Sequence, residues 1–276
     1  MSFEILCVTM NQNSFAKIKE MNIKSNVVFA NQSNETSFKI MKFGDDKTAK
    51  MITTDTKGVG INRNLALLYA TRDICLFSDD DVCYFDNAEE IVLSEFKNHP
   101  NADAFLFHFL SDSDDRLIKS YKKTRRVHRF EKKPWATFQI AFRLSSIKKQ
   151  KIFFSTLFGG GCIYPCGEDS LIIREMFKKK LKIFVSKYSI GRVSFKESSW
   201  FSGYNQSYFY GQGAFYQLAS PFFKWIWFLY VVFRTRKDKE LSNSEKMSWM
   251  KKGACGFKKM LSYSDYLTLD SIGKNV

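Results

Sequence analysis

Short apolar runs without polar alternation recur along the chain, and each ends in a polar segment. These runs lie at residues 3–10, 26–30, 51–54, 74–78 and 104–109. An apolar run of four to eight residues is typical of a strand buried on both faces of a sheet. Apolar residues with helical spacing follow several of them, at 14–23, 65–70 and 88–93. The pattern therefore predicts a three-layer α/β fold, in which helices cover both faces of a mostly parallel sheet.

Local signals refine these predictions. Ser14 and Asp86 stand where N-caps of the first and third helices are expected. We expect further strands at 137–147 and 181–196, the second with a turn at Gly191.

Three consecutive carboxylates follow one of the apolar runs. Residues 74–81 read Ile-Cys-Leu-Phe-Ser-Asp-Asp-Asp, so the acids stand where a buried strand leaves the sheet. Open α/β sheets bind their ligands at this edge. In an extended chain Asp79 and Asp81 point to one side and Asp80 to the other, which gives two carboxylates that can address one divalent ion. A hydrated turn is the simpler interpretation, and the surrounding motifs decide between the two.

A glycine-rich segment and a second acidic pair follow later in the chain. Residues 158–170 read Phe-Gly-Gly-Gly-Cys-Ile-Tyr-Pro-Cys-Gly-Glu-Asp-Ser and precede an amphipathic helix predicted at 171–177. Consecutive glycines allow the backbone to approach a ligand closely. N-terminal capping by Asp169 would explain one acid, but it requires neither the glycines nor Glu168.

Aromatic residues dominate the C-terminal part. Residues 199–213 mix aromatic and polar side chains, which suits either a sugar-stacking surface or ordinary packing. The run 222–233 is shorter than the ~20 residues that cross a bilayer. Its Trp and Tyr content and basic flanks are typical of an element in a membrane interface, although a buried helix or an oligomer contact explains it about equally well.

These features predict two parts. We expect a domain over residues 1–215 and a helical, aromatic-basic extension over 216–276 that associates with a membrane or oligomerises. The length of 276 residues and the 45% hydrophobic content suffice for one large domain with such an appendage.

The chain is strongly basic, with a formal net charge of +15. Such a charge implies an anionic partner, which can be nucleic acid, a membrane surface or a phosphorylated substrate. The basic residues of 119–133 form either a solvated loop or edge hairpin, or a contact to phosphate or anionic lipid. Scattered cysteines, and an N-terminus without a basic region followed by an apolar stretch, lead us to expect reduced thiols in the cytosol.

The order of the motifs resembles that of the family 2 glycosyltransferases with the GT-A fold. It consists of strands with polar exits, the segment Gly-Val-Gly-Ile-Asn-Arg-Asn at 58–64, the triple Asp, the three glycines and Gly-Glu-Asp. The resemblance covers residues 1 to about 215 and is strongest to short bacterial members that build capsular or surface polysaccharide. It implies a Rossmann-like nucleotide-binding domain with a mixed, mostly parallel sheet flanked by helices.

The resemblance also implies roles for individual residues. Asp81 corresponds to a metal ligand, Asp79 to a contact to ribose or metal, and Asp169 to the catalytic base of an inverting transfer. Further nucleotide contacts are implied for Asp80, Arg63, Asn64, Thr9, Asn11 and Asn31. Acceptor contacts are implied for Gly160, Gly161, Glu168 and Trp200.

The same resemblance implies cofactors and a cellular setting. We expect Mn²⁺ or Mg²⁺, a nucleotide-sugar donor with a UDP-sugar as first choice, and a saccharide or lipid-linked glycan acceptor. We expect peripheral contact with an anionic membrane at the cytoplasmic face of a bacterial cell, no nucleic-acid partner, and leave homo-oligomerisation open.

Two features depart from the family pattern, and two other functions stay open. The loop at 31–34 is Asn-Gln-Ser-Asn where many members have an acid that reads the base, and no His follows His128 to serve as a further metal ligand. A metal-dependent nucleic-acid-binding protein or nuclease would use the triple Asp and the basic residues of 119–133. In a membrane-associated scaffold the triple Asp would be only a turn.

Overall fold

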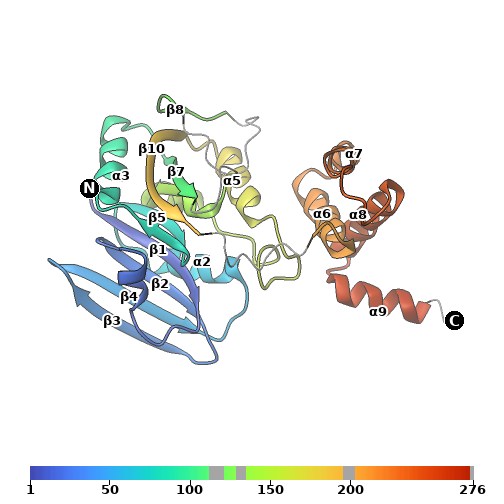
Figure 1. The fold of residues 1–276 in the computed structure, drawn as a ribbon, viewed down its shortest axis with the longest axis horizontal. Coiled ribbons are helices and arrows are strands. Elements are labelled where there is room, and N and C mark those ends of the chain that lie inside the picture. The colour runs from blue at the N-terminus through green and yellow to red at the C-terminus, as the bar shows by residue number, and fades with distance from the viewer. Residues whose placement is uncertain (112–120, 129–134, 195–202, 274–276) are drawn as a thin grey trace. The chain divides into compact units, whose positions relative to one another are not determined.

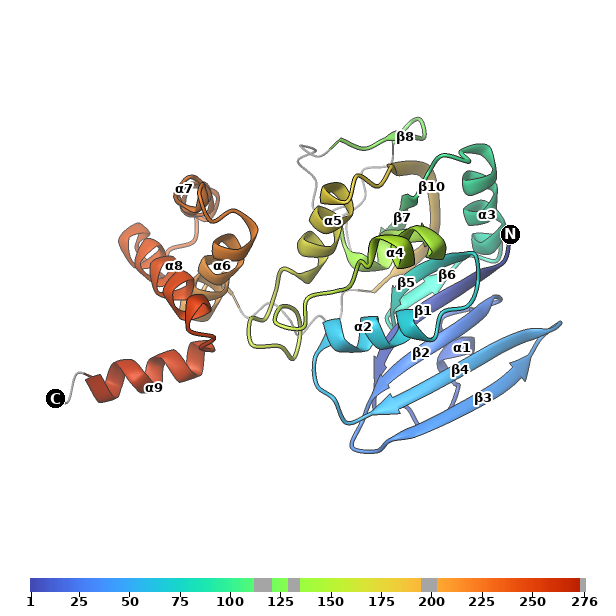
Figure 2. The ribbon, with the colours of Figure 1, turned by 180° about the vertical axis from the view of Figure 1, so that it is seen from behind.

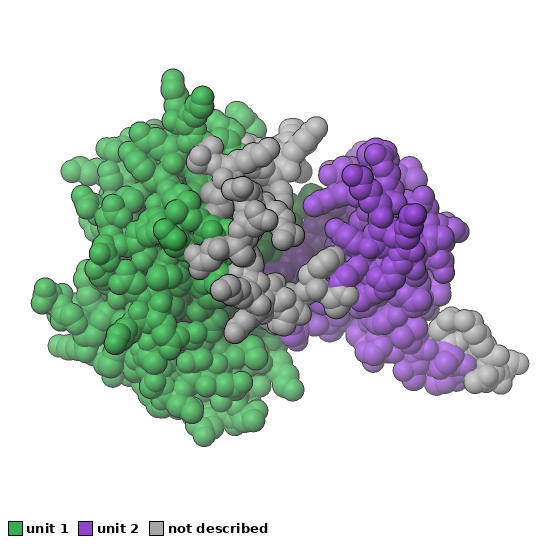
Figure 3. All heavy atoms as spheres, in the orientation of Figure 1, with its two compact units in different colours: residues 1–154, 169–197 green, residues 155–168, 198–276 purple. Residues whose placement is uncertain are grey.

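The computed structural model describes residues 1–111, 121–128, 135–194 and 203–273. The chain divides into two compact units (Figure 3). Unit 1 comprises residues 1–154 and 169–197, and unit 2 comprises 155–168 and 198–276. The functional division that we expect after residue 215 stays a prediction.

Unit 1 is built on one mixed sheet (Figure 1). Its strand order is β3-β4-β2-β1-β5-β9-β7-β10-β6, and β8 pairs with β10. The strands are β1 (Phe3–Met10), β2 (Asn26–Gln32), β3 (Ser37–Phe43), β4 (Lys47–Thr54), β5 (Ile74–Asp79), β6 (Val82–Tyr84), β7 (Ala104–Ser111), β8 (Arg125–Arg126), β9 (Ile140–Arg143) and β10 (Ile183–Val193). The expected α/β fold with a mostly parallel sheet is confirmed.

The neighbouring strands β4, β2, β1 and β5 run parallel, so their carboxyl ends meet at one edge of the sheet. In their register Thr9 pairs with Asn31, and Asn31 pairs with Thr53. Val8 of β1 pairs with Asp79 of β5. The polar exits expected from the sequence are thereby neighbours in space.

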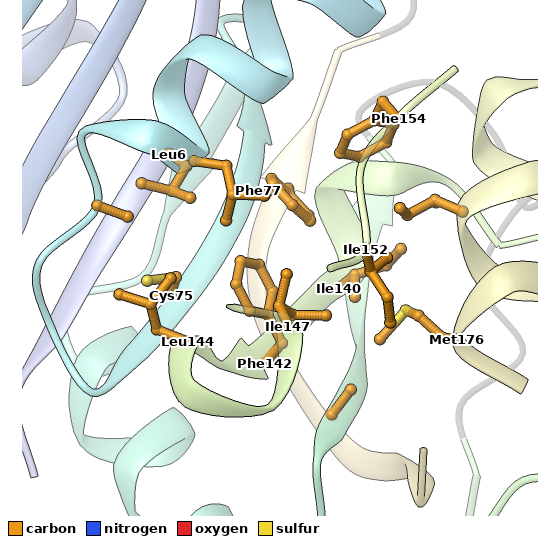
Figure 4. Close-up of a cluster of buried hydrophobic side chains, with 14 of the residues drawn as sticks. Leu6, Cys75, Phe77, Ile140, Phe142, Leu144, Ile147, Ile152, Phe154 and Met176 are labelled. Atoms are coloured by element: carbon orange, nitrogen blue, oxygen red, sulfur yellow. The ribbon is translucent and has the colours of Figure 1, made fainter. Parts of the chain in front are cut away.

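Helices pack on both faces of this sheet (Figure 2). They are α1 (Lys17–Glu20), α2 (Val59–Leu68), α3 (Ala88–Asn98), α4 (Leu144–Gln150) and α5 (Glu168–Lys178). Alternate residues of each strand serve opposite faces, since Leu6 packs with the residues of α2, α4 and α5 while Ile5 packs with those of α1 and α3. The first of these clusters includes Phe77, Phe142 and Phe154 (Figure 4). This packing makes unit 1 a three-layer structure.

Several local predictions were wrong. Residues 137–147 form a 3₁₀ turn (Thr137–Gln139), β9 and the start of α4 in place of one strand. Gly191 lies inside β10, where a Cβ would come within 2.6 Å of the Cys83 carbonyl oxygen of β6. The missing side chain of Gly191 therefore allows β6 to pack closely against β10, and the residue forms no turn.

The two expected caps were wrong as well. The N-cap of α1 is Ala16, and that of α3 is Asn87. Asp86 instead pairs with Lys24 at 2.5 Å. The tertiary ion pair thus replaces the local cap at this position.

Unit 2 is helical, which confirms the helical C-terminal extension. Its helices are α6 (Gln206–Ala219), α7 (Lys224–Arg234), α8 (Asn243–Lys258) and α9 (Tyr263–Gly273). Helices α6, α7 and α8 enclose a small core of Phe209, Phe228, Val231, Met250 and Ala254.

The crossing of α6 and α8 depends on glycines. A Cβ on Gly213 would lie 2.0 Å from the Met250 carbonyl oxygen, and one on Gly253 would lie 1.9 Å from that of Tyr210. Backbone atoms cannot swing aside as a flexible side chain can, so the two helices pack this closely only because both positions lack a side chain.

We expect Gly213→Ala to destabilise unit 2 by at least about 1–3 kcal/mol, because the added methyl group forces the helices apart. The measurement is urea unfolding followed by tryptophan fluorescence. Gly211→Ala in the same helix is the matched control, since its Cβ would meet nothing closer than 3.7 Å. Equal unfolding midpoints for the two variants would contradict this account of the crossing.

Candidate active site

A buried arginine joins two acids that are far apart in the sequence. Arg63 on α2 donates from Nη2 to Asp79 Oδ1 at 2.8 Å. Its Nη1 lies 3.5 Å from Asp169 Oδ1. The side chain of Arg63 is 5% exposed, whereas those of Asp79 and Asp169 are 33% and 35% exposed. The acids therefore face solvent from either side of one buried cation.

The fold places these three side chains through its element ends. Asp79 is the last residue of β5, and Asp169 lies in the first turn of α5. Helix α2 begins after Gly58, whose positive φ of 123° turns the chain and whose N–H donates to Gln32 at the end of β2. The sequence predicted all three residues as site residues, and the structure brings them together within unit 1.

The remaining acids of the triple Asp differ in their surroundings. Thr9 at the end of β1 donates its hydroxyl to Asp80 Oδ2 at 2.5 Å. Asp81 forms no ion pair with any residue that the structure describes. Partial desolvation, with the negative charges of Asp79 and Asp80, raises the pKa of Asp81 from 3.8 to about 6. Asp81 is thus the acid of this group whose charge is least compensated.

Thr137 was missed by the sequence analysis. Its hydroxyl donates to Asp169 Oδ1, the oxygen that also faces Arg63. Thr137 is 1% exposed. It is separated from Asp169 by 32 residues, and no local pattern indicates the contact. Thr137 and Arg63 therefore contact the same carboxylate oxygen of Asp169.

Two predicted nucleotide contacts hold the backbone in place. Asn31 accepts from the Gln12 N–H and donates to the Gln12 carbonyl, both at 2.9 Å, and is fully buried. Asn64 forms the same kind of pair with the backbone of Phe154. The Asn31 amide thereby fixes the segment that follows β1, and the Asn64 amide fixes the backbone at Phe154. Arg63 stacks on the ring of Phe154, with its Cζ 5.4 Å from the ring centroid.

Asn11 lies at the exit of β1 and is exposed. Its positive φ of 54° turns the chain, and its N–H donates to the Gln32 carbonyl at 2.8 Å. It is the predicted nucleotide contact that leaves its side chain toward solvent.

Three of the four predicted acceptor residues, Gly160, Gly161 and Glu168, lie in or directly after the glycine-rich loop of unit 2. There Gly161 has a positive φ of 74° in a loop that an isolated β-bridge between Phe158 and Tyr164 closes. Gly160 is buried in this loop, and Glu168 begins α5. Trp200 lies outside the described residues. The three glycines therefore serve the turn of this loop, and the acceptor contacts stay a prediction.

The structure also bears on metal binding. Within the described ranges, no group of three or more His, Cys, Asp or Glu side chains converges on one point. An ion at Asp81 would therefore take most of its ligands from outside these residues. The Asp81 carboxylate, whose charge is only partly compensated, lies beside a second carboxylate fixed by Arg63, and this pair fits the oxygen chemistry that Mn²⁺ and Mg²⁺ prefer.

Comparison with solved structures shows the same fold in a protein of S. aureus, TarS. The crystal structure of TarS 1-349 is 14% identical to this chain, with a TM-score of 0.58 over 95% of this chain and 93% of that one. TarS 1-349 in complex with UDP-GlcNAc is 16% identical, with a TM-score of 0.59 over 93% and 71% of the two chains. Its complex with UDP is 15% identical, with a TM-score of 0.56 over 93% and 70%. The expected GT-A fold is confirmed.

Sequence comparison identifies the family. No curated protein matches the chain significantly. Glycosyl transferase family 2, in contrast, matches residues 20–163, which is more than half of the chain and includes Arg63 and the triple Asp. The chain therefore belongs to the family 2 glycosyltransferases and is an enzyme that transfers a sugar from a nucleotide-sugar donor.

Proposed function

We propose that this enzyme transfers a sugar from a UDP-sugar to a saccharide or lipid-linked glycan acceptor, with inversion at the anomeric carbon. The observation that carries the proposal is the Arg63 side chain, which joins Asp79 to Asp169 in one site. The UDP and UDP-GlcNAc complexes of TarS, which has the same fold, support UDP as the nucleotide.

The donor side of the proposed site consists of Asp79 and Asp81. Asp81 would hold Mn²⁺ or Mg²⁺ together with the diphosphate, and the ion would neutralise charge on the leaving group. Asp79 is held by Arg63 and faces the ribose or the ion. Asp80 takes neither the metal-binding nor the ribose-binding role in this proposal. Its carboxylate accepts a hydrogen bond from the hydroxyl of Thr9 and is therefore directed toward β1.

Asp169 is the proposed base. The acceptor hydroxyl oxygen forms the new bond to the anomeric carbon, the bond from that carbon to the diphosphate oxygen breaks, and UDP leaves. Asp169 takes the hydroxyl proton. Thr137 and Arg63 both contact Oδ1 of Asp169 and thereby orient its carboxylate.

We further propose that the acceptor belongs to surface polysaccharide of the capsular type, assembled at the cytoplasmic face of a bacterial membrane. The net charge of +15 supports a setting beside anionic lipid or phosphorylated acceptors. The residues 121–128 that the structure describes within the basic cluster include the exposed pair of β8 at an edge of the sheet. We propose no nucleic-acid partner.

Asp169→Asn tests the base directly. We expect kcat for UDP release in the presence of a saccharide acceptor to fall about 10²–10⁴-fold, because the amide cannot accept the proton. UDP affinity in Mn²⁺ should stay within a few-fold of wild type, since the donor side is intact. Transfer at the wild-type rate by this variant would remove Asp169 as the base.

Thr137→Val tests how the base is held. The variant keeps the side-chain volume but removes the hydroxyl that stabilises the ionised Asp169, so we expect the acid limb of the pH profile of kcat to move to higher pH. Thr137→Ser should restore the wild-type profile. An unchanged profile in the valine variant, with a normal melting temperature, would contradict a positioning role.

Asp81→Asn tests the acid whose charge is least compensated. A folded-state pKa raised to about 6 means that ionised Asp81 destabilises the metal-free fold above pH 6, and that this cost vanishes as pH falls toward 4. After discounting for solvent screening, we expect about 1 kcal/mol, so the melting temperature in EDTA at pH 7.5 should rise by about 2–4 °C.

The same variant should lose the stabilisation that UDP with Mn²⁺ gives to the wild type, because the carboxylate that holds the ion is gone. Asp45→Asn, in the exposed turn between β3 and β4, is the control. It should change neither the melting temperature in EDTA nor the one with UDP and Mn²⁺. Stabilisation of Asp81→Asn by UDP and Mn²⁺ to the wild-type extent would show that Asp81 is not the ligand.

A further inference from the structure

Helix α7 in unit 2 presents apolar side chains on both of its sides. Phe228 and Val231 are 0% and 5% exposed and pack into the core of unit 2. The other side of α7 and the turn before it carry large apolar residues that are about half exposed or more: Phe222, Phe223, Ile226, Leu229, Tyr230 and Phe233. We call these six residues the α7 ridge. An amphipathic helix of a globular protein would place polar residues there, so the ridge requires a separate explanation.

The ridge belongs to an anchored helix. The buried Lys246 of α8 donates from Nζ to the carbonyl oxygens of Thr235 and Asp238, at 2.9 and 2.8 Å. A cation at a helix C-terminus binds the carbonyl groups left without intrahelical partners. Because Lys246 fixes the end of α7 while Phe228 and Val231 fix its inner side, the exposure of the ridge is a property of the folded unit.

Cations border the ridge. Arg236 lies 4.1 Å from the ring centroid of Phe233. Lys224 and Lys251 lie 5.3 and 5.9 Å from that of Trp225, which is 49% exposed. Residues 222–259 contain ten lysines and arginines and only three acids. The apolar surface is therefore bordered by positive charge.

We propose that the α7 ridge inserts into the interface of an anionic phospholipid membrane, with α7 lying in the membrane plane. Aromatic and aliphatic side chains would enter the boundary of the acyl chains, while Lys224, Arg236 and Lys251 bind lipid phosphates. None of the helices in the described part of the chain is long and apolar enough to cross a membrane. With 11 residues, α7 is about 16 Å long, which fits a helix that lies on a bilayer.

Charge favours a membrane over a second copy of this chain. Pairing two ridges would bring two cationic borders together, and like charges in contact oppose association. Anionic headgroups instead attract cations, and each lysine or arginine near the membrane surface adds about 1 kcal/mol of favourable binding free energy. The inference deepens the proposed function, because it rests on that function for the membrane-bound acceptor and identifies the surface that makes the contact.

The test is flotation of the full chain with phosphatidylglycerol-rich vesicles and with pure phosphatidylcholine vesicles. We expect binding to the anionic vesicles that weakens with salt. The double variant Ile226→Gln, Leu229→Gln should bind at least roughly tenfold more weakly, because two large apolar groups no longer leave water. Ile40→Gln with Leu68→Gln in unit 1 is the matched control, since these residues are 59% and 65% exposed against 64% and 63% for the ridge pair.

The control pair should bind vesicles like the wild type. The inference is overturned if the wild type stays unbound on anionic vesicles, if the ridge variant binds equally well, or if the wild type forms an oligomer that the ridge variant abolishes while vesicle binding is absent. Stabilisation by UDP with Mn²⁺ is measured on the same samples. Its absence with vesicle binding retained would overturn the proposed function and leave the ridge assignment standing.

Discussion

The site of unit 1 depends on one buried cation. Arg63 is almost fully buried, and a guanidinium in such a position is stable only if acids pair with it. One of these acids is Asp79 at the end of β5. The other is Asp169 in the first turn of α5, which is 106 residues from Arg63 in the sequence. Removing one acid would leave the cation partly uncompensated, so the two carboxylates that we assign to donor and acceptor chemistry are also held as a structural pair.

The parallel strands supply the frame for this pair. Because β4, β2, β1 and β5 end at the same edge, the polar residues that follow each strand are forced together. Some of them hold the backbone, as Asn31 does, and others, such as Asp81, carry a charge that is only partly compensated. A carboxylate such as Asp81, which destabilises the metal-free fold, is physically sensible where a cation and a diphosphate bind.

Much of this could be predicted from the sequence, because apolar runs and the residues directly after them carry the signal. The strand before Asp79 and the helix that begins near Asp169 are local features. The contact of Thr137 could not be predicted, since it joins two segments through a buried hydroxyl with no periodic pattern. The expected strand at 137–147 was wrong because its apolar residues are shared between a short strand and a helix. The turn expected at Gly191 was wrong because this glycine allows β6 to approach β10 closely, and a contact between strands far apart in the sequence leaves no local pattern.

The central claim is that Asp79, Asp81 and Asp169 surround one nucleotide-sugar site. The most direct measurement is a crystal structure of the chain with UDP and Mn²⁺, with anomalous diffraction to locate the metal. We predict a manganese peak within coordination distance of the Asp81 carboxylate and of the UDP diphosphate, on the side of the site that Asp169 faces. A bound UDP whose diphosphate and manganese lie away from Asp79 and Asp81 would contradict the account.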